Sequence, residues 1–149
     1  MIRRIAATFE ADRGLAEELA QDIRFALWAA LPAFRQQASL RTFVARVATN
    51  RSITHVKRRM RLPPAAELSE TLPADEADPE QQAINRDRQH QLLAAMQRLP
   101  LSLRQVASLT LEGLGLAEIA DVLGLTVNAV TIRLSRAKDA LRHTMGEDK

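Results

Sequence analysis

The chain has 149 residues, no cysteine, five glycines and a net charge of +3, and 46% of its residues are hydrophobic. This composition excludes disulfides, a thiolate zinc site and a mainly disordered chain, while the length suffices for one ordinary domain or two small ones. His55, His90 and His143 are too widely spaced for a ligand cluster, so we expect no metal and no cofactor. Without a signal-peptide core or a run of about 18 apolar residues, the protein is expected to be soluble and cytoplasmic, with no membrane insertion.

Helices are expected throughout, because Ala, Leu, Arg, Glu and Gln dominate and lose least on entering a helix. We therefore predict an all-α protein. Three helices are expected in the N-terminal part, over residues 2–10, 15–30 and 40–60. The second stops before Pro32, which disfavours the α conformation of its predecessor, and Ser39 can cap the third. The side of the second helix that is expected to face the core carries Leu19, Ile23, Leu27 and Trp28.

The stretch RLPPAAELSETLPADEADPEQQ holds four of the six prolines and six acidic residues. Residues 1–62 carry a net charge of +7, residues 63–85 a net −6 and residues 86–149 a net +2. Compact domains seldom contain unstructured loops beyond about 15 residues, so this stretch is interpreted as a linker. The prediction is two small helical domains, at 1–62 and 79–149, joined by an acidic, proline-rich linker at 63–78. Two basic segments favour a polyanionic partner.

Capping patterns divide the C-terminal part into further helices. Asp78 can cap a helix that reaches Arg98, and Ser102 is expected to open a second one in the same way. That helix should end near Gly113, where glycine suits a left-handed cap. The remaining stretch, LAEIADVLGLTVNAVTIRLSRAKDAL, is typical of two short helices joined at Gly124. Its second helix would be capped by Thr126.

The second helix of this pair has one apolar and one polar face. The apolar stripe, which is expected in the core, consists of Val127, Val130, Leu134, Ala137 and Leu141. Short polar groups with cations behind them suit insertion into a major groove, where side chains read base edges and contact phosphates. The candidate DNA-contacting residues are Thr126, Asn128, Thr131, Ile132, Arg133, Ser135 and Arg136. A solvated face on an ordinary helical hairpin is the alternative; small Ala120, Gly124 and Val130 at the expected offsets favour DNA.

The C-terminal half, LPLSLRQVASLTLEGLGLAEIADVLGLTVNAVTIRLSRAKDALR, resembles region 4 of bacterial RNA polymerase sigma factors of the extracytoplasmic-function group. The N-terminal stretch ELAQDIRFALWAALPAFRQQASLRTFVARVATNRSITHVKRRMR resembles region 2 of the same family. The resemblance covers nearly the whole chain apart from the linker. It implies a two-domain, non-enzymatic sigma factor whose partners are core RNA polymerase, promoter DNA and an anti-sigma factor.

The resemblance also implies roles for individual residues. Docking on the polymerase clamp would involve Glu18, Leu19, Gln21 and Asp22. The helix 126–141 would read the −35 element. The turn from Phe34 to Leu40, together with Asn50, would form a pocket for a base flipped from the −10 element, and cations of the third helix would follow phosphates. The residues expected at the −10 element are Phe34, Arg35, Ala38, Ser39, Leu40, Arg41, Arg46, Asn50, Lys57 and Arg58.

The chain departs from the family pattern at a few positions. Phe43 and Ala45 stand where the family often has tryptophan and tyrosine, so fewer rings are available for stacking on bases. Thr131 and Ile132 stand where a basic residue and a serine are common, which predicts a different −35 preference. The family's first helix also usually extends about a dozen residues further upstream.

Two other functions are compatible with the residues. A stand-alone helix-turn-helix regulator would bind DNA through residues 116–141 and use its N-terminal domain for dimerisation or signal input, with half-site symmetry in its target. A degenerate sigma-like interaction module would occupy polymerase or an anti-sigma factor without reading DNA. Catalysis has no support, because no nucleophile triad, phosphate-binding glycine loop or paired carboxylates can be recognised.

Overall fold

The computed structural model describes residues 1–36, 38–61 and 79–146. These residues form helices and no strand, so the predicted all-α fold is confirmed. The predicted linker and the predicted cap Asp78 lie outside the described residues. The elements are α1 (Ile2–Phe9), α2 (Arg13–Ala30), the 3-10 helix η1 (Leu31–Ala33), α3 (Leu40–Met60), α4 (Pro79–Arg98), α5 (Leu101–Leu111), α6 (Leu116–Leu123) and α7 (Val127–Met145).

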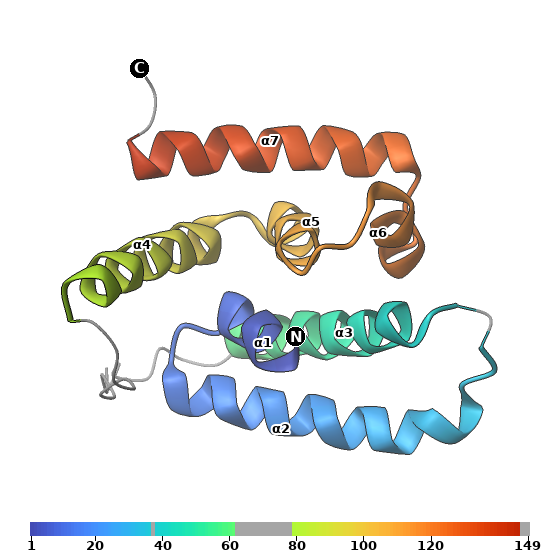
Figure 1. The fold of residues 1–149 in the computed structure, drawn as a ribbon. Helices are drawn as coiled ribbons and strands as arrows, with labels where there is room; N and C mark the ends of the chain where they lie inside the picture. The colour runs from blue at the N-terminus through green and yellow to red at the C-terminus, as the bar shows by residue number, and fades with distance from the viewer. Residues whose placement is uncertain (37, 62–78, 147–149) are drawn as a thin grey trace.

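The helices form two units that lie against each other (Figure 1). We call α1–α3 the N-terminal unit and α4–α7 the C-terminal unit. Within the first, α1 packs on both α2 and α3; within the second, α7 packs across α4, α5 and α6. The units meet because α1 also contacts α4 and α5, while α3 contacts α5 and α6. Residues far apart in the sequence are therefore brought together along α1 and α3.

Side-chain caps explain where three helices begin. Ser39 Oγ accepts the Thr42 N–H at 3.1 Å and Thr126 Oγ1 accepts the Ala129 N–H at 3.1 Å, so both predicted caps are confirmed. Asp12 starts α2 slightly earlier than predicted. The predicted cap at Ser102 is wrong: α5 begins at Leu101, directly after Pro100, and Ser102 lies inside its first turn. Proline supplies the fixed backbone angle without a side-chain cap.

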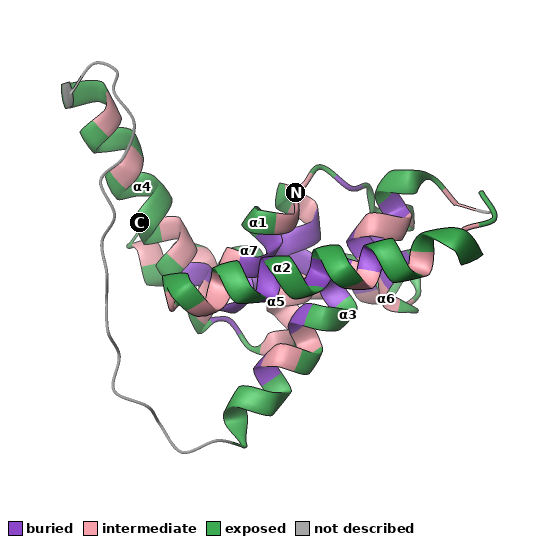
Figure 2. Ribbon diagram, turned by 90° about the horizontal axis from the view of Figure 1, so that it is seen from below, coloured by how far each residue is buried: buried purple, intermediate pink, exposed green. Residues whose placement is uncertain are grey.

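The core of the N-terminal unit is built from apolar side chains of α1, α2 and α3. Figure 2 shows the buried residues gathered where the helices cross. On α3, Ala48 and Ser52 are fully buried, and their small size lets α1 approach closely. The buried apolar residues of this core are Ile5, Ala6, Phe9, Leu19, Ala20, Ile23, Leu27, Ala48 and Val56.

One core prediction for α2 is wrong. Leu19, Ile23 and Leu27 are buried as expected, but the side chain of Trp28 is 77% exposed. Successive helical residues point about 100° apart, since a turn takes 3.6 residues. When Leu27 faces the core, Trp28 is therefore directed to the outer side of α2. Its exposure is a surface feature that needs a functional explanation.

The C-terminal unit has two small clusters of buried side chains. One joins α4, α5 and α7 through Met96, Leu99, Ala107 and Ala137. The other lies between α5, α6 and α7 and contains Val106, Leu109, Leu114, Ile119, Ala120, Val122 and Val130. From the predicted stripe of α7, Val130 and Ala137 are buried and Leu134 and Leu141 are partly buried. Val127 is 46% exposed, against prediction, because it is the first residue of the helix and lies beyond the packed turn.

Candidate functional site

The C-terminal unit contains a helix-turn-helix made by α6 and α7. Gly124 ends α6 in the left-handed conformation, with φ of +67°, and nothing would obstruct a Cβ there, so backbone conformation is the reason for glycine. The Leu125 N–H donates to the Ala120 carbonyl oxygen at 2.9 Å and closes the turn. The predicted turn and the predicted start of α7 are thus confirmed.

The outer face of α7 is exposed in the described part of the chain. Of the predicted base-contacting residues, Thr126, Asn128, Thr131, Ile132, Ser135 and Arg136 are exposed. Arg133 is only partly exposed and lies at the flank of this face. The Thr131 hydroxyl donates to the Val127 carbonyl oxygen at 2.9 Å. Together these side chains offer a polar helix face with one exposed guanidinium.

A shallow hollow of about 350 Å³ lies beside this face. Thr131 and Ser135 line it together with the start of α6, which sequence patterning had not linked to the site. The hollow also contains an acid, Asp139, whose Oδ1 is 3.4 Å from Nη1 of Arg142. Its lining is Leu116, Thr131, Leu134, Ser135, Lys138, Asp139 and Arg142.

A second hollow, which we call the aromatic hollow, lies where η1 leads into α3. Its volume is about 200 Å³, and its lining is Ala33, Phe34, Arg35, Ala38, Phe43 and Arg46. The rings of Phe34 and Phe43 are 4.8 Å apart between centroids and tilted by 40°. This arrangement combines an aromatic surface with two guanidinium groups, which are donors only. It suits a flat group with acceptor atoms, such as a nucleobase.

The predicted pocket residues only partly coincide with this hollow. Phe34, Arg35, Ala38 and Arg46 line it. Asn50 is exposed but lies one turn further along α3, outside the lining, while Ser39 caps α3 and Leu40 is exposed at its start. Phe43 also lines the hollow, although in the sequence it is only a departure from the family pattern and not a predicted site residue. The signal that could have identified Phe43 is an aromatic residue in the first turn of the helix that follows the predicted loop.

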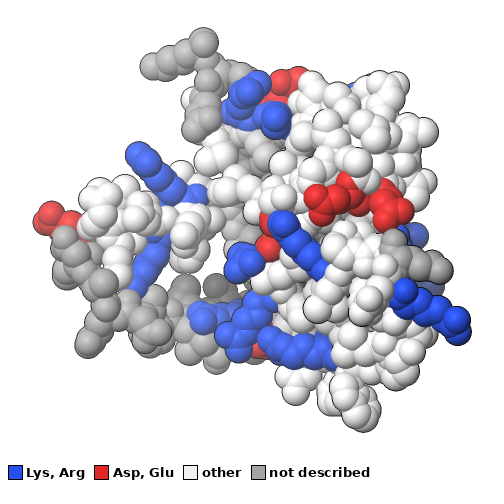
Figure 3. Space-filling model, turned by 45° about the vertical axis from the view of Figure 1, so that its right-hand side comes forward, with Lys and Arg blue, Asp and Glu red and all other residues white. Residues whose placement is uncertain are grey.

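The cations of α3 fall into two groups. Lys57 and Arg58 are exposed, and in the described part of the chain neither is paired with an acid. Those with a partner within the protein are Arg41, on the Glu112 carbonyl oxygen; Arg46, on Asp121; Arg51, on Asp22; and Arg59, on Glu10. Figure 3 shows Lys and Arg side chains in separate groups on both units, with acidic side chains between them. The cations of α3 are thus not all available to bind phosphates.

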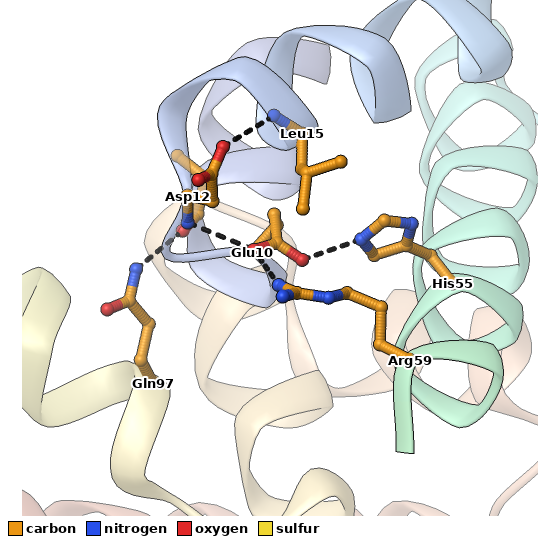
Figure 4. Close-up of polar contacts among 7 residues, drawn as sticks. Glu10, Asp12, Leu15, His55, Arg59 and Gln97 are labelled. Atoms are coloured by element: carbon orange, nitrogen blue, oxygen red, sulfur yellow. Dashed lines mark hydrogen bonds and ion pairs between the residues drawn. The ribbon is translucent and has the colours of Figure 1, made fainter. Parts of the chain in front are cut away.

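Arg59 is held by a buried carboxylate at the end of α1 (Figure 4). The Glu10 side chain is only 2% exposed, lies 2.7 Å from His55 Nε2, accepts from Arg59, and accepts the Asp12 N–H at 2.9 Å. Burial raises the pKa of Glu10, but the hydrogen bonds from His55, Arg59 and Asp12 outweigh it, so that the pKa is lowered overall. The cluster ties α1 to the C-terminal half of α3. Arg59 therefore serves the fold, against the expectation that it follows phosphates.

The predicted polymerase-docking residues share α2 but not one face. Glu18, Gln21 and Asp22 are exposed, whereas Leu19 is 2% exposed and belongs to the core. Leu19 therefore cannot touch a partner and instead fixes which way the other three point. The same outer side carries Phe25 and Trp28, which with Gln21 and Arg24 line an almost wholly apolar hollow of about 400 Å³. Phe25 was missed, although the inward positions of Ile23 and Leu27 place it outside.

Contacts between α1 and the C-terminal unit involve charged and polar side chains. Arg4 donates twice to the Glu112 carboxylate, at 2.8 and 2.9 Å, and this hydrogen bond and the opposite charge raise the pKa of Arg4. Gln97 Nε2 donates to the Ala7 carbonyl oxygen at 3.0 Å. Burial lowers the pKa of Arg104, which donates to the carbonyl oxygens of Gln97 and Leu99 and lies 6.0 Å from the Phe9 ring centroid.

In the described part of the chain, no three His, Asp or Glu side chains are grouped so that they could hold a metal ion. None of the described helices is both long and apolar enough to cross a membrane. Three exposed surfaces of the described residues are candidates for recognising a partner: the outer face of α7, the aromatic hollow and the outer face of α2.

Comparisons with known proteins identify the family of the chain. Residues 1–62 match the family Sigma-70 region 2, and residues 89–141 match Sigma-70, region 4. The RNA polymerase sigma-H factor of Pseudomonas aeruginosa is 30% identical over 143 residues, which cover 89% of this chain and 74% of the relative. The ECF RNA polymerase sigma factor SigG of Mycobacterium tuberculosis is 34% identical over 153 residues, which cover 85% of this chain and 41% of SigG. The chain thus spans less than half the length of SigG.

Two solved structures share the fold over 99% of the chain. The sigma factor RpoE in complex with the anti-sigma factor NepR, from Bartonella quintana, has a TM-score of 0.76 at 20% identity and is covered over 91% of its length. CnrH in complex with the cytosolic domain of CnrY has a TM-score of 0.70 at 23% identity and is covered over 82%. The resemblance found in the sequence is confirmed. The chain belongs to the sigma-70 family, as an alternative sigma factor of the extracytoplasmic-function group that directs transcription initiation.

Proposed function

We propose that the chain binds core RNA polymerase through the outer face of α2. Glu18 and Asp22 lie four residues apart, so their carboxylates share one side of the helix with Gln21. Next to them, Phe25 and Trp28 expose aromatic surface that has no partner in the described part of the chain. A basic partner with apolar surface would complement this face, and exposed aromatic groups of this kind often supply much of the binding energy at an interface.

The aromatic hollow would capture one unpaired base of the −10 element. Extruding a base from a duplex costs a few kcal/mol of stacking, which a ring surface can recover because each stacked base contributes about 1–3 kcal/mol. Arg35 and Arg46 at the hollow would bind carbonyl or phosphate oxygens. Lys57 and Arg58 would follow the phosphates of the same strand further along α3.

The outer face of α7 would enter the major groove at the −35 element. Thr131, Ile132 and Ser135, which are exposed, would contact base edges, Arg136 would contact a guanine, and Arg133 at the flank would contact a phosphate. The observation that carries the proposal is the coexistence, in one chain, of this free helix face and a base-sized aromatic hollow with guanidinium groups. A single-site DNA-binding regulator has no need of the second feature.

The remaining parts of the proposal follow from the partner. Bond-making would belong to the polymerase, so the chain itself would be no enzyme, and it would act in the cytoplasm. An anti-sigma factor would hold it inactive by covering the surfaces that bind polymerase or DNA. Support for this last partner comes from the solved sigma factor RpoE of Bartonella quintana, which is bound to the anti-sigma factor NepR.

In-vitro transcription with core polymerase from the source organism tests the proposal. A library of promoters is transcribed with and without the chain, and the transcripts are sequenced. We expect transcripts that need both the chain and core polymerase, from promoters that share two sequence elements. Binding to a symmetric DNA site without polymerase would instead indicate a stand-alone regulator. Association with polymerase or an inhibitor with no dependent transcript would indicate an interaction module.

A further inference from the structure

Glu10 is a buried acid whose two carboxylate oxygens both bind other parts of the protein. Oε2 lies 2.7 Å from His55 Nε2, while Oε1 accepts from Arg59 and, at 2.9 Å, from the Asp12 N–H. We call these four residues the Glu10 cluster (Figure 4). The Glu10 side chain is 2% exposed, whereas that of Arg59 is 40% exposed. Burying a carboxylate is costly unless it is fully paired, so the cluster is expected to keep its geometry.

The backbone around Glu10 is fixed by the ends of two helices. The Glu10 N–H donates to the Ala6 carbonyl oxygen at 2.9 Å and ends α1. Two residues later, Asp12 begins α2 by accepting the Leu15 N–H at 2.9 Å. The Glu10 side chain therefore projects from a short connection with a helix end on either side. It is a well-fixed point of attachment for α3.

The last turn of α3 has few other contacts that could hold it in place. Val56 is the last buried residue of the helix, and every residue from 57 to 61 is exposed. Four of these five residues are cations, and like charges three or four residues apart destabilise a helix. Most helical stability in proteins comes from packing, so an unpacked, cationic helix end tends to fray. In the described part of the chain, Arg59 is the one cation of this turn that is paired with an acid.

Lys57 and Arg58 are directed away from α1 as long as this turn is helical. Successive residues lie about 100° apart around a helix, so the orientation that presents Arg59 to α1 turns both neighbours outward. Lys57 follows Asn50 by about two turns and Arg46 by about three, so the three share one side of α3. Arg46 lines the aromatic hollow. A row of side chains thus runs from the hollow along α3 for about 16 Å, at 1.5 Å per residue, and fraying of the last turn would remove Lys57 from it.

From these contacts we propose that Glu10 is a positioning residue for promoter binding. Through Arg59 it keeps the end of α3 helical and so holds Lys57 and Arg58 on the path of the −10 strand. This inference rests on the proposed function, in which these two cations follow phosphates. It adds that a buried acid, which touches no nucleic acid itself, determines where they stand. Arg59 is then the connecting group and not a phosphate ligand.

Positioning by Glu10 has an effect opposite in sign to that of simple charge screening. Removing an acid near a group of cations ordinarily strengthens binding to a polyanion. Glu10→Gln should instead weaken binding, because the neutral amide no longer holds Arg59 by charge and the last turn of α3 loses its attachment. The direction of the change in affinity therefore distinguishes positioning from screening.

The test measures how holoenzyme, the full-length chain with core polymerase, binds a fluorescein-labelled promoter at several salt concentrations. The promoter is one that depends on the chain in the transcription assay, opened beforehand by mismatches over its −10 element so that melting makes no contribution. The variants are Glu10→Gln, the double change Lys57→Ala with Arg58→Ala, and all three changes together. Glu17→Gln makes the same chemical change at an exposed acid of α2. Ile5→Val trims a fully buried side chain of α1 and destabilises the same unit without touching the Glu10 cluster.

At 0.1 M salt, the loss of one phosphate contact to a single strand lowers affinity about fivefold, given a log–log slope of about 0.7 per contact. The double change at Lys57 and Arg58 should therefore cost about 25-fold and lower the slope by about 1.4. Glu10→Gln should cost about 5- to 25-fold and lower the slope by about 0.7 to 1.4, according to whether one or both cations lose their place. Added to the double change, Glu10→Gln should cost less than about twofold, because the contacts that it supports are already gone. Both controls should leave affinity and slope unchanged.

A second variant covers the case in which Glu10→Gln does not fold. Arg59→Gln breaks the same attachment of α3, while His55 and the Asp12 N–H still bind the Glu10 carboxylate. The same loss of affinity is expected from it, and the same disappearance of that loss once Lys57 and Arg58 are alanine.

Three outcomes would overturn the inference. Unchanged or stronger binding by Glu10→Gln would mean that the acid only screens the cations. A loss that persists in full when Lys57 and Arg58 are alanine, or one that Ile5→Val reproduces, would mean general destabilisation of the unit. Failure of the proposed function looks different: either no promoter depends on the chain, or the double change at Lys57 and Arg58 itself leaves affinity and slope unaltered, and the inference then falls with it.

Discussion

The two faces that we assign to DNA differ in how free they are. The outer face of α7 has its polar side chains exposed, and among the described helices none of α1–α3 contacts α7. The face of α3 next to the aromatic hollow is partly used, because Arg41 and Arg46 bind Glu112 and Asp121 of the C-terminal unit. Side chains of similar type are thus not equally available to bind DNA. A cation on a nucleic-acid-binding helix is a ligand for phosphate only when the tertiary structure leaves it unpaired.

The two units also differ in what holds them together. In the N-terminal unit, a buried carboxylate, Glu10, joins α1 to α3 through His55 and Arg59. In the C-terminal unit, the well-covered carboxylate of Glu112 is paired with Arg4, across the boundary between the units. The first cluster stabilises one unit by itself. The second stabilises the contact between the units, and separation would expose it to water.

The largest effect is expected at the outer face of α2. Reversing Glu18 and Asp22 together to Lys should weaken association with core polymerase at least about 100-fold, since like charges at an interface cost several kcal/mol. Pull-down of core polymerase measures the loss. A control with the same change in charge is Glu17→Lys with Asp87→Lys, two exposed acids outside this set. Undiminished association of the Glu18/Asp22 variant would refute the docking assignment.

The aromatic hollow gives the next largest effect. Phe34→Ala removes one ring of the tilted aromatic pair and should lower transcription from a duplex promoter by roughly 5- to 150-fold, the equivalent of about 1–3 kcal/mol of base stacking. On a promoter opened beforehand by mismatches the loss should be smaller, because the duplex no longer needs to be melted. Phe34→Tyr keeps a ring and serves as the matched variant. Equal losses on both templates would argue against base capture in the hollow.

On α7, two arginines three residues apart should behave differently. Arg136→Ala should cost about 1–3 kcal/mol at a single base position, because a guanidinium can bind both acceptors of a guanine edge. Arg133→Ala should weaken binding to all sequences alike and reduce the salt slope by about one, the effect of one lost phosphate contact. Titrating holoenzyme against single-base promoter variants at several salt concentrations separates the two. If neither change alters affinity, preference or slope, the outer face of α7 does not meet DNA.

The smallest effect concerns stability rather than binding. Glu10→Gln leaves Arg59 and His55 without their carboxylate and should lower the free energy of unfolding by about 1–2 kcal/mol at neutral pH. The folded pKa of Glu10 is lowered, so its contribution is full above the ordinary glutamate value of about 4.3 and is lost as pH falls through the folded value. Urea unfolding at pH 7 and at pH 3 should show the gap between wild type and variant closing at the lower pH. Glu17→Gln, an exposed change, should show no such gap.

Local patterns in the sequence predicted most of the helices of the fold. The helix periods, the caps Ser39 and Thr126 and the glycine at position 124 depend on interactions within about four residues, so they can be recognised without tertiary information. Ser102 was misread for the same reason: a serine-to-glutamine spacing is a local signal, and the proline two residues before it is a stronger one. Trp28 was misplaced because hydrophobicity alone does not say which of two adjacent residues faces inward.

The candidate sites likewise differ in how much of each could be predicted from local patterns. Sequence alone indicated which residues could read DNA on α7, because the inward stripe of one helix leaves its other face outside. It also indicated most of the residues that line the aromatic hollow. It did not indicate that Phe43 supplies the second ring or that Asn50 lies outside the lining, because the path of the chain from η1 into α3 determines which side chains line the hollow.

Only the tertiary structure decided which charges are available. Arg46 meets Asp121 across 75 residues of sequence, and Arg41 meets Glu112 across 71. Such pairs follow from how α5 and α6 rest on α3, and this packing depends on the buried surface around Ala45. Short-range patterns determine helices and their faces, because their interactions are local. Which face covers which is decided by the sum of many weak, non-directional contacts over the whole chain, and no short stretch of sequence contains that sum.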